Sequence, residues 1–291
     1  MSKKSIKDIL QAPKGMRDFF GEEYTKRKNF FRVAESIAER YGFSGIETPI
    51  MEHTEIFNKG IGEGTDIVDK EMYNLETSGG DRLTLRPEGT ASIMRSYIEH
   101  GMGSLPQPLL FHYSGPFFRH EKPQKGRYRQ LYQFGLEIMG AKNPIYDGLI
   151  IQTGYEILCK TKKDIVVGIN TIGSKSERTE FIKKLSDFYT KNETEIADSD
   201  RRRIVSNPLR ILDSKEIETK KINESAPKLW DSLGKDSKDY FNAVLSQLDA
   251  LAIHYKVIPE LVRGLDYYEH TVFEFSTQDV QGNQTLALGG G

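Results

Sequence analysis

Apolar and polar residues alternate along the chain at intervals that predict a mixture of helices and hairpins. Between Lys26 and Tyr41 the apolar positions fall three or four residues apart and Gly42 follows, so we expect an amphipathic helix that ends there. The stretch that continues to His53 reads as a strand. Pro49 lies within it and has no N–H to donate, so we expect an edge position or an exit from the sheet at that point.

Two hairpins are predicted in the next part of the chain. The turn SGGD separates EMYNLET from RLTLRPE, which predicts a hairpin over residues 71–88, and a helix should begin at Thr90 and end at Gly101. PLLFHYSGPFFRHE and RQLYQFGLEIMG form a longer pair, joined by the polar loop KPQKGRY. Because no helix lies between them, they predict an antiparallel sheet and an α+β fold.

The second half of the chain differs in composition. Residues 170–255 are rich in Lys, Glu, Asp and Ser and include helical segments such as RTEFIKKLSDFY, so they are predicted to form a helical insertion. LVRGLDYYEHTVFEF, residues 261–275, then returns to the sheet. The predicted organisation is a first sheet-containing part at 1–169, the insertion at 170–255 and return strands at 256–291.

Composition is that of a soluble globular protein: of 291 residues, 37% are hydrophobic and 29% are charged. No apolar run approaches the roughly 18 residues of a membrane span, and the first residues lack the apolar core of a secretory signal. We therefore predict a cytoplasmic protein with no membrane partner. The lone cysteine, Cys159, excludes an internal disulfide, and its apolar neighbours predict a buried filler rather than a nucleophile. The histidines show no metal-ligand spacing, so no metal site is predicted.

Candidate chemistry begins with a local cluster of cations. The net charge is only −1, but the region 119–129 concentrates basic residues against the single acid Glu121; they are Arg119, Lys122, Lys125, Arg127 and Arg129. Phosphate binding depends on where cations cluster rather than on net charge. The region is therefore a candidate to face a phosphate.

The strand QLYQFGLEIMG places polar groups on one face. Side chains alternate along a strand, so Gln133, Gly135 and Glu137 share a face while Phe134 and its even-numbered neighbours face the core. Positions 133 and 137 should lie about 13 Å apart, at roughly 3.3 Å per residue. A glycine between an amide and a carboxylate lets a ligand lie against the backbone. The alternative is a solvated face with a glycine β-bulge.

The turn LRPEGT supplies another carboxylate. Pro87 and Gly89 fix a turn into the helix, and Glu88 lies at that helix start. Its common use is to cap the helix, worth about 0.5–1 kcal/mol; its alternative use is to hold an ammonium group. Acceptors at one end of a sheet and arginines at the other suit an amino acid beside a phosphate. Such a site needs no general base, because an amino acid carboxylate is already ionised and can attack an α-phosphate directly.

FRHE followed by RYRQLYQFGLE resembles the second signature motif of the class II aminoacyl-tRNA synthetases. LTLRPEGT, RGLDYY and LALGGG are similar to motifs of the histidyl-tRNA synthetase family, and the resemblance runs from GMRDFFGEE to the last glycine. It implies a class II antiparallel β-sheet flanked by helices, with residues 1–169 and 256–291 as the catalytic domain. It also implies ATP-dependent activation of histidine to histidyl-adenylate, transfer to tRNA(His), Mg²⁺ with ATP, and a homodimer formed through the family's first motif.

The resemblance also implies roles for individual residues. Histidine binding falls to Glu88, Thr90, Gln133, Glu137, Tyr267 and Tyr268; ATP binding to Arg119, Glu121, Arg127 and Arg263; and catalysis to Arg119 and Arg263. Glu137 and Tyr268 would contact the imidazole nitrogens. Both tyrosines could instead be sheet-packing aromatics, a reading that suits Tyr267 better than Tyr268.

Members of the family continue beyond LALGGG through a third motif and an anticodon-binding domain. We therefore expect this chain to be a truncated catalytic region that keeps histidine binding, binds ATP more weakly and has lost anticodon-based selection. The alternative function is that of a histidine-sensing regulatory subunit of ATP phosphoribosyltransferase. The phosphate-facing arginines favour the enzyme, because a sensor does not need them.

Overall fold

The computed structural model describes residues 10–62, 65, 67–121, 128–262, 267–279 and 282–291. It divides into two compact units, residues 1–141 and residues 142–291, and each is described by itself. Both combine sheets and helices, as the predicted α+β class requires. Two short pairings are parallel, β1 (Ser44–Gly45) with β5 (Leu109–Phe118) and β7 (Ile165–Thr171) with β8 (Tyr255–Val257). The two sheets that contain these pairs are therefore mixed, and the third sheet is antiparallel.

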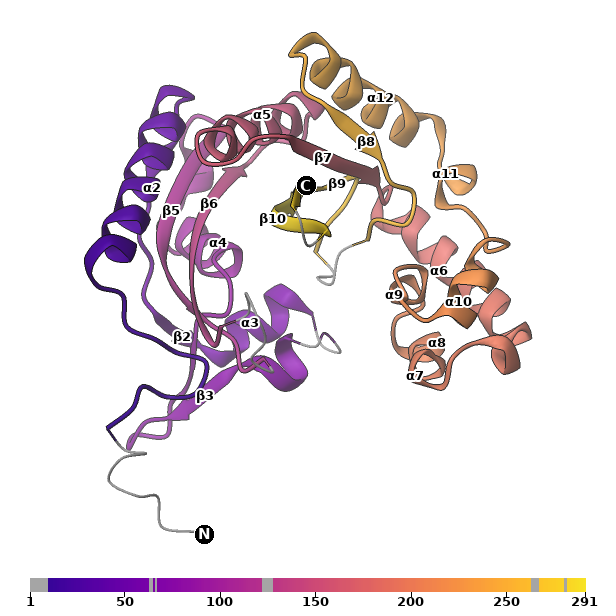
Figure 1. Cartoon of the computed structure of the whole chain (residues 1–291), viewed down its shortest axis with the longest axis horizontal. Helices are drawn as coiled ribbons and strands as arrows, with labels where there is room; N and C mark the ends of the chain where they lie inside the picture. The colour runs from indigo at the N-terminus through magenta and orange to yellow at the C-terminus, as the bar shows by residue number, and fades with distance from the viewer. Residues whose placement is uncertain (1–9, 63–64, 66, 122–127, 263–266, 280–281) are drawn as a thin grey trace. The chain divides into compact units, whose positions relative to one another are not determined.

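The main sheet of the first unit has the strand order β1-β5-β6. It consists of β1 (Ser44–Gly45), β5 (Leu109–Phe118) and β6 (Gln130–Met139), and the predicted β5–β6 pair is antiparallel without a register shift. Helix α2 (Gly21–Arg40) runs along one face of this pair (Figure 1). Ser114 Oγ on β5 donates to Glu35 Oε1 on α2 at 3.0 Å, which identifies the even-numbered face of β5 as the α2 side.

A smaller sheet of the first unit has the order β2-β4-β3 and contains the predicted hairpin. Its strands are β2 (Met51–His53), β3 (Tyr73–Glu76) and β4 (Arg82–Leu85); the helices beside it are α3 (Thr54–Ile61), η1 (Ile67–Glu71), α4 (Thr90–Glu99) and η2 (Met102–Ser104). The stretch expected to be a strand leading to Pro49 leaves the ladder at the proline, as expected. It forms β1 and β2 with Pro49 between them, because the proline cannot donate to a ladder.

The sheet of the second unit has the order β10-β9-β7-β8. Its strands are β7 (Ile165–Thr171), β8 (Tyr255–Val257), β9 (Thr271–Asp279) and β10 (Gly282–Gly290). Helices α5 (Pro144–Cys159) and α12 (Lys235–Ala250) pack on it around a buried core that includes Ile151, Val167, Ile169, Phe241, Val244, Leu248, Phe273 and Phe275. The segment 261–275, expected to return to a sheet, ends in β9, and the domain bounds 256–291 stay a prediction.

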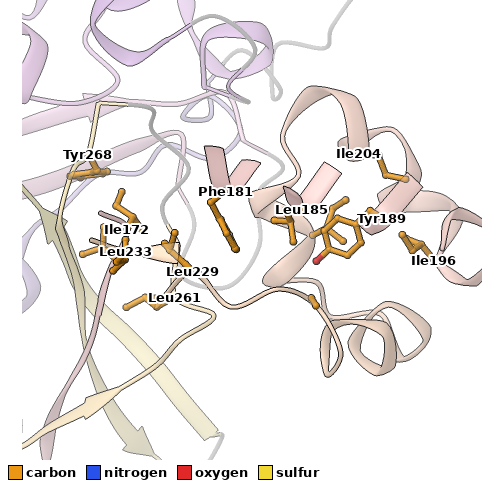
Figure 2. Packing of buried hydrophobic residues seen from close by; sticks show 13 residues of the cluster. Ile172, Phe181, Leu185, Tyr189, Ile196, Ile204, Leu229, Leu233, Leu261 and Tyr268 are labelled. Atoms are coloured by element: carbon orange, nitrogen blue, oxygen red, sulfur yellow. The ribbon is translucent and has the colours of Figure 1, made fainter. Parts of the chain in front are cut away.

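A run of helices lies between β7 and α12 (Figure 1). They are α6 (Lys175–Lys191), η3 (Glu193–Glu195), α7 (Asp198–Arg201), α8 (Arg203–Ser206), α9 (Leu209–Leu212), α10 (Ile217–Asn223) and α11 (Leu229–Ser232). They have their own apolar cluster around Phe181, Leu185 and Tyr189 (Figure 2). The helical character agrees with the predicted insertion, while its bounds at 170 and 255 stay a prediction, since α12 packs on the sheet.

Cys159 corrects an expectation from the sequence. The cysteine is exposed at the last residue of α5, whereas its apolar neighbours predicted burial. Those neighbours face the sheet and Cys159 does not, because successive residues of a helix point in different directions. Among the helices in the described ranges, none is both long and apolar enough to cross a bilayer.

Candidate functional site

The β5–β6 register brings the polar positions of β6 onto one face of the sheet. Gln133 pairs with Gly115, Gly135 with Tyr113 and Glu137 with Phe111. Residues directly opposite in an antiparallel pair share a face. Since Ser114 faces α2, Gln133, Gly135 and Glu137 lie on the side away from α2. The predicted alternation is therefore confirmed.

A hydrogen bond joins this face to the turn LRPEGT. Thr90 Oγ1, at the first residue of α4, donates to Glu137 Oε1 at 2.7 Å across 47 residues of sequence. Glu88 lies in the same turn and is only 5% exposed. Its carboxylate accepts from the amide nitrogens of Thr90 and Ala91, each at 2.8 Å. The capping role of Glu88 is thus present, and a carboxylate has further lone pairs that could accept an ammonium donor.

Both carboxylates are held in an environment that disfavours their charged form. Burial raises the pKa of Glu137 to about 7; the Thr90 hydrogen bond opposes this shift and the charge of Glu88 adds to it. Burial also raises the pKa of Glu88, against its backbone hydrogen bonds and the positive charge of Arg119. Raised carboxyl pKa values are common at binding sites, where a cationic ligand can restore the charge balance.

Arg119 is tied to the same turn at the end of β5. Its Nε donates to the carbonyl oxygen of Pro87 at 2.8 Å, next to Glu88 in sequence. Its backbone N–H donates to the carbonyl of Arg129 at 2.9 Å, and Arg129 Nε donates to the carbonyl of Glu121 at 3.2 Å. The structure therefore brings Arg119 beside Glu88, and Glu121 is held at the base of the basic region. Arg127 lies outside the described residues.

Tyr113 was missed by sequence reasoning and corrects the reading of Gly135. Its ring lies against both Gly89 and Gly135, so a Cβ at either glycine would fall inside the ring. The space that Gly135 leaves open is filled by a neighbouring strand, and the uninterrupted register excludes the β-bulge considered above. A detectable signal existed: an aromatic residue opposite a glycine in a strand pair tends to cover it.

Arg86 was also missed, and it fixes the turn from beneath. The side chain is 5% exposed, with Nε donating to Pro116 O at 3.1 Å and Nη1 to Thr48 O at 2.9 Å. Its guanidinium carbon lies 4.6 Å from the centre of the Phe117 ring. These bonds join β5, the turn and the segment before β2. No sequence pattern separates Arg86 from an ordinary surface arginine.

The other assigned site residues belong to the second unit. Arg263 lies outside the described residues. Tyr268 is 8% exposed and is part of the apolar cluster of the helical region (Figure 2), and Tyr267 packs against that cluster. The two ring centres lie 4.7 Å apart. Val272 and Phe275 are buried and anchor β9 behind the tyrosines, as expected.

No cluster suited to a metal ion occurs in the part of the chain that the structure describes, where a cluster means three or more His, Cys, Asp or Glu side chains. The described polar groups of the site are carboxylates, an amide, a hydroxyl and a guanidinium. This set matches the ammonium, imidazole and anionic groups of an amino acid beside a phosphate. It provides hydrogen-bond acceptors at Glu88 and Glu137 and a cation at Arg119.

Comparison with known proteins shows which family the chain resembles. The model of the family "Histidyl-tRNA synthetase" matches residues 15–291. The histidine–tRNA ligase of Thermosynechococcus vestitus is 42% identical over 283 residues, covering 97% of this chain and 66% of the relative. That of Acetivibrio thermocellus is also 42% identical, over 284 residues, covering 97% of this chain and 68% of the relative. The chain thus spans about two thirds of the length of these relatives.

Solved structures give the same result. Apo histidyl-tRNA synthetase of S. aureus superposes with a TM-score of 0.77 at 32% identity, covering 97% of this chain and 66% of that one. A protein of Bacillus halodurans described as an ATP phosphoribosyltransferase regulatory subunit/histidyl-tRNA synthetase shares the fold, with a TM-score of 0.69 at 20% identity and coverage of 100% and 77%. By its motifs, its fold and these relatives, the chain belongs to the histidyl-tRNA synthetase family.

Proposed function

We propose that this chain carries the catalytic region of a histidine–tRNA ligase, which activates histidine with ATP and transfers it to tRNA(His). In the first step an oxygen of the histidine carboxylate attacks the α-phosphorus of ATP. A bond forms between that oxygen and phosphorus, the bond from the α-phosphorus to the bridging oxygen breaks, and pyrophosphate leaves. In the second step a terminal hydroxyl of tRNA attacks the carbonyl carbon of histidyl-adenylate, and AMP leaves.

The chain's own residues supply positioning and charge for the first step. Arg119, held by Pro87, would stabilise the negative charge that builds on the α-phosphate oxygens. Glu121 and Arg127 would bind other parts of ATP, and Arg263 would reach the α-phosphate and the histidine carboxylate. Mg²⁺ is expected to arrive with ATP and would neutralise phosphate charge. These assignments rest on the family resemblance.

The family resemblance assigns histidine selection to carboxylates and tyrosines. Glu88, Thr90 and Gln133 would bind the amino acid backbone, and Glu88 would accept from the α-ammonium. Glu137 would accept the N–H of the imidazole ring, with Tyr268 serving the other ring nitrogen and Tyr267 adding a nearby aromatic wall. An apolar side chain would leave the buried polar groups unpaired, at about 1–3 kcal/mol for each group.

The observation that carries the proposal is the bond from Thr90 to Glu137. It fixes a recessed carboxylate, with a pKa near 7, beside the helix-capping Glu88 and the turn that holds Arg119. A solvated sheet face would not hold a carboxyl group in that state. A carboxylate that receives an imidazole N–H would explain why an acid with a raised pKa persists there.

The test is exchange of labelled pyrophosphate into ATP by the 291-residue chain in the presence of each of the twenty amino acids. Exchange that requires histidine supports the proposal. A folded chain that binds histidine without exchange would favour the histidine-sensing alternative. A folded chain that shows neither exchange nor histidine binding contradicts both functions.

The partners and location are proposed from the family resemblance. We propose a homodimer formed through the region of α2 and β1, a tRNA(His) substrate, and a cytoplasmic location. Sedimentation equilibrium of the chain tests the first of these. Charging of a tRNA(His) transcript tests the tRNA substrate. This experiment is informative once the protein has been shown to form the adenylate.

A further inference from the structure

The segment that precedes β9 is fastened at both ends by side chains to which the family resemblance assigns no role. It leads from β8 through Leu261 to Tyr267 and Tyr268, and residues 263–266 within it lie outside the described ranges. Leu261 and Tyr268 are both buried in the apolar cluster of the helical region. The contacts of Leu261 and Tyr268 therefore fix the two ends of the segment.

Asn170 holds the entry of the segment. It lies near the end of β7 and is 7% exposed. Its Nδ2 donates to the carbonyl oxygens of Pro259 at 2.9 Å and Leu261 at 3.0 Å. The buried Asn170 side chain thus donates both of its amide hydrogens to one short stretch of backbone. Burying an amide is costly unless it is fully paired, so this arrangement specifies one backbone path.

Arg178 holds the exit of the segment. It lies in the first turn of α6, and its Nη1 donates to the carbonyl oxygen of Tyr268. That first turn is itself fixed by the capping box between Ser174 and Glu177. Figure 2 shows Tyr268 beside Ile172, in the linker between β7 and α6. A charged donor on a capped helix is therefore aimed at the backbone of a residue assigned to the histidine ring.

Backbone bonds frame these two side-chain contacts. The Ile258 N–H donates to Ile169 O at 2.9 Å before the segment, and after it the His270 N–H donates to Gly173 O at 2.8 Å. The end of β7 and the start of α6 thus border the segment on both sides. Asn170 adds side-chain bonds to the carbonyls of Pro259 and Leu261, and Arg178 adds one to the carbonyl of Tyr268.

We propose that Asn170 and Arg178 are positioning residues that act through the backbone of this segment. Asn170 fixes the Leu261 side, from which Arg263 follows, and Arg178 fixes the carbonyl of Tyr268. The inference rests on the proposed function of Arg263 and Tyr268. Because the two clamps act on different ends, they should affect different kinetic constants: Asn170 the rate of adenylate formation, and Arg178 the apparent affinity for histidine.

Asn170→Asp tests the first clamp. It keeps the size of the side chain but turns an oxygen toward two carbonyl oxygens. Asn223→Asp is the matched control, because Asn223 Nδ2 also donates to two carbonyls, Ile211 O at 2.8 Å and Leu212 O at 3.2 Å, inside the helical region. We expect kcat of histidine-dependent exchange to fall about tenfold or more for Asn170→Asp and less than about twofold for the control. Asn170→Ala provides a second variant if the aspartate prevents folding.

Arg178→Ala tests the second clamp. We expect the KM for histidine to rise about tenfold with a smaller change in kcat, and Arg178→Lys to recover part of the loss because an ammonium can donate to the same carbonyl. Arg201→Ala is the matched control, since Arg201 Nε donates to the carbonyls of Glu193 at 3.0 Å and Ile196 at 3.2 Å. All variants are compared where circular dichroism shows them folded.

Hydrogen exchange of the intact chain supplies a readout independent of activity. Asn170→Asp and Arg178→Ala should speed amide exchange within residues 262–269, and the two controls should not. Equal kinetic losses in variants and controls, or unchanged exchange in this segment, would overturn the proposal. If the unaltered chain lacks pyrophosphate exchange, the proposed function fails on its own. The hydrogen-exchange comparison then still decides whether the clamps exist.

Discussion

Glu137 in the first unit and Glu177 in the second are both carboxylates beside a helix start, yet their pKa values move in opposite directions. Burial raises the pKa of Glu137 to about 7, although the carboxylate accepts a hydrogen bond from the Thr90 hydroxyl. Burial also raises the pKa of Glu177. Bonds from the amides of Ser174 and Gly234 and the hydroxyls of Ser174 and Ser237 outweigh it and lower that pKa to about 2.

The difference is that several backbone and side-chain donors stabilise the charge of Glu177, whereas burial disfavours the charge of Glu137. Glu177 caps α6 and also accepts a hydrogen bond from the amide of Gly234, the residue before α12. Its carboxylate therefore joins the starts of two helices. Within the described residues, the hydrogen bond to the Glu137 carboxylate comes from the Thr90 hydroxyl, and ionisation of Glu137 costs stability. A protein tolerates such a group where a ligand supplies the missing donor. The contrast supports histidine recognition at Glu137.

The largest expected effect on histidine binding comes from Glu137. Glu137→Gln keeps an oxygen for Thr90 but removes the charge that would accept an imidazole N–H. Loss of a half-buried carboxylate acceptor is worth about 1–3 kcal/mol, so calorimetry should show histidine affinity reduced roughly ten- to hundredfold. Glu76→Gln, on an exposed position of β3, is the control and should leave affinity unchanged. Equal affinities for all three proteins would remove Glu137 from the histidine site.

The next effect is on stability and concerns Glu177. Glu177→Ala removes the acceptor shared by the starts of α6 and α12, and each cap is worth about 0.5–2 kcal/mol. Urea unfolding should therefore show a loss of about 1–4 kcal/mol. Glu180→Ala, exposed on the same helix, should change stability by less than about 0.5 kcal/mol. A loss no larger than that of the control would mean that the joint cap is not needed.

The pH dependence of stability should show the two carboxylates with opposite signs. Glu177 has a lower pKa in the folded chain than the unfolded value of 4.5, so its ionised carboxylate stabilises the fold above pH 4.5. The stability lost in Glu177→Ala should therefore shrink as pH falls from 4.5 toward 2. Glu137 has a higher pKa in the folded chain than in the unfolded chain, so its contribution to stability is fully present below pH 4.5. This contribution is lost as pH rises through about 7. Glu137→Gln should therefore gain stability relative to the unaltered chain, by about 1–2 kcal/mol at pH 8. The measurement is urea unfolding at a series of pH values, and parallel curves would refute it.

The smallest effect concerns Thr90. Thr90→Val removes the hydroxyl that donates to Glu137 at 2.7 Å, a bond worth about 0.5–1.5 kcal/mol. Histidine affinity should fall about three- to tenfold at pH 7.5. The pKa of Glu137 should rise further, because the bond that lowers it is gone. Thr90→Ser should retain most of the affinity, and a serine variant as weak as the valine would argue for a packing role instead.

Local signals predicted much of the first unit. The hairpin turn at SGGD, the helix start at Thr90 and the β5–β6 pair all depend on residues close in sequence, and all three are confirmed. Helix α5 was not predicted, because its apolar residues surround it rather than forming one stripe. Its start was nonetheless readable: Asn143 accepts from the Ile145 amide and Pro144 follows as the first helical residue.

Contacts between distant segments could not be predicted from patterns alone. The resemblance named both Thr90 and Glu137, but only the structure shows that one donates to the other. Tyr113 required the strand register, and Arg86 required knowledge of which carbonyls converge beneath the turn. Such residues act through geometry that no local spacing encodes, whereas the carboxylates and arginines were identifiable by their chemistry.

The most direct test of the account is the pKa of Glu137 itself, measured by carbon NMR of the side-chain carboxyl with and without histidine. We expect a value of about 7 in the free chain. Saturating histidine should lower it by about one unit or more, because a bound imidazole N–H favours the ionised carboxylate. Glu137→Gln removes the signal and confirms the assignment. A pKa near 4.5 that does not respond to histidine would contradict the claim that this carboxylate is kept for the substrate ring.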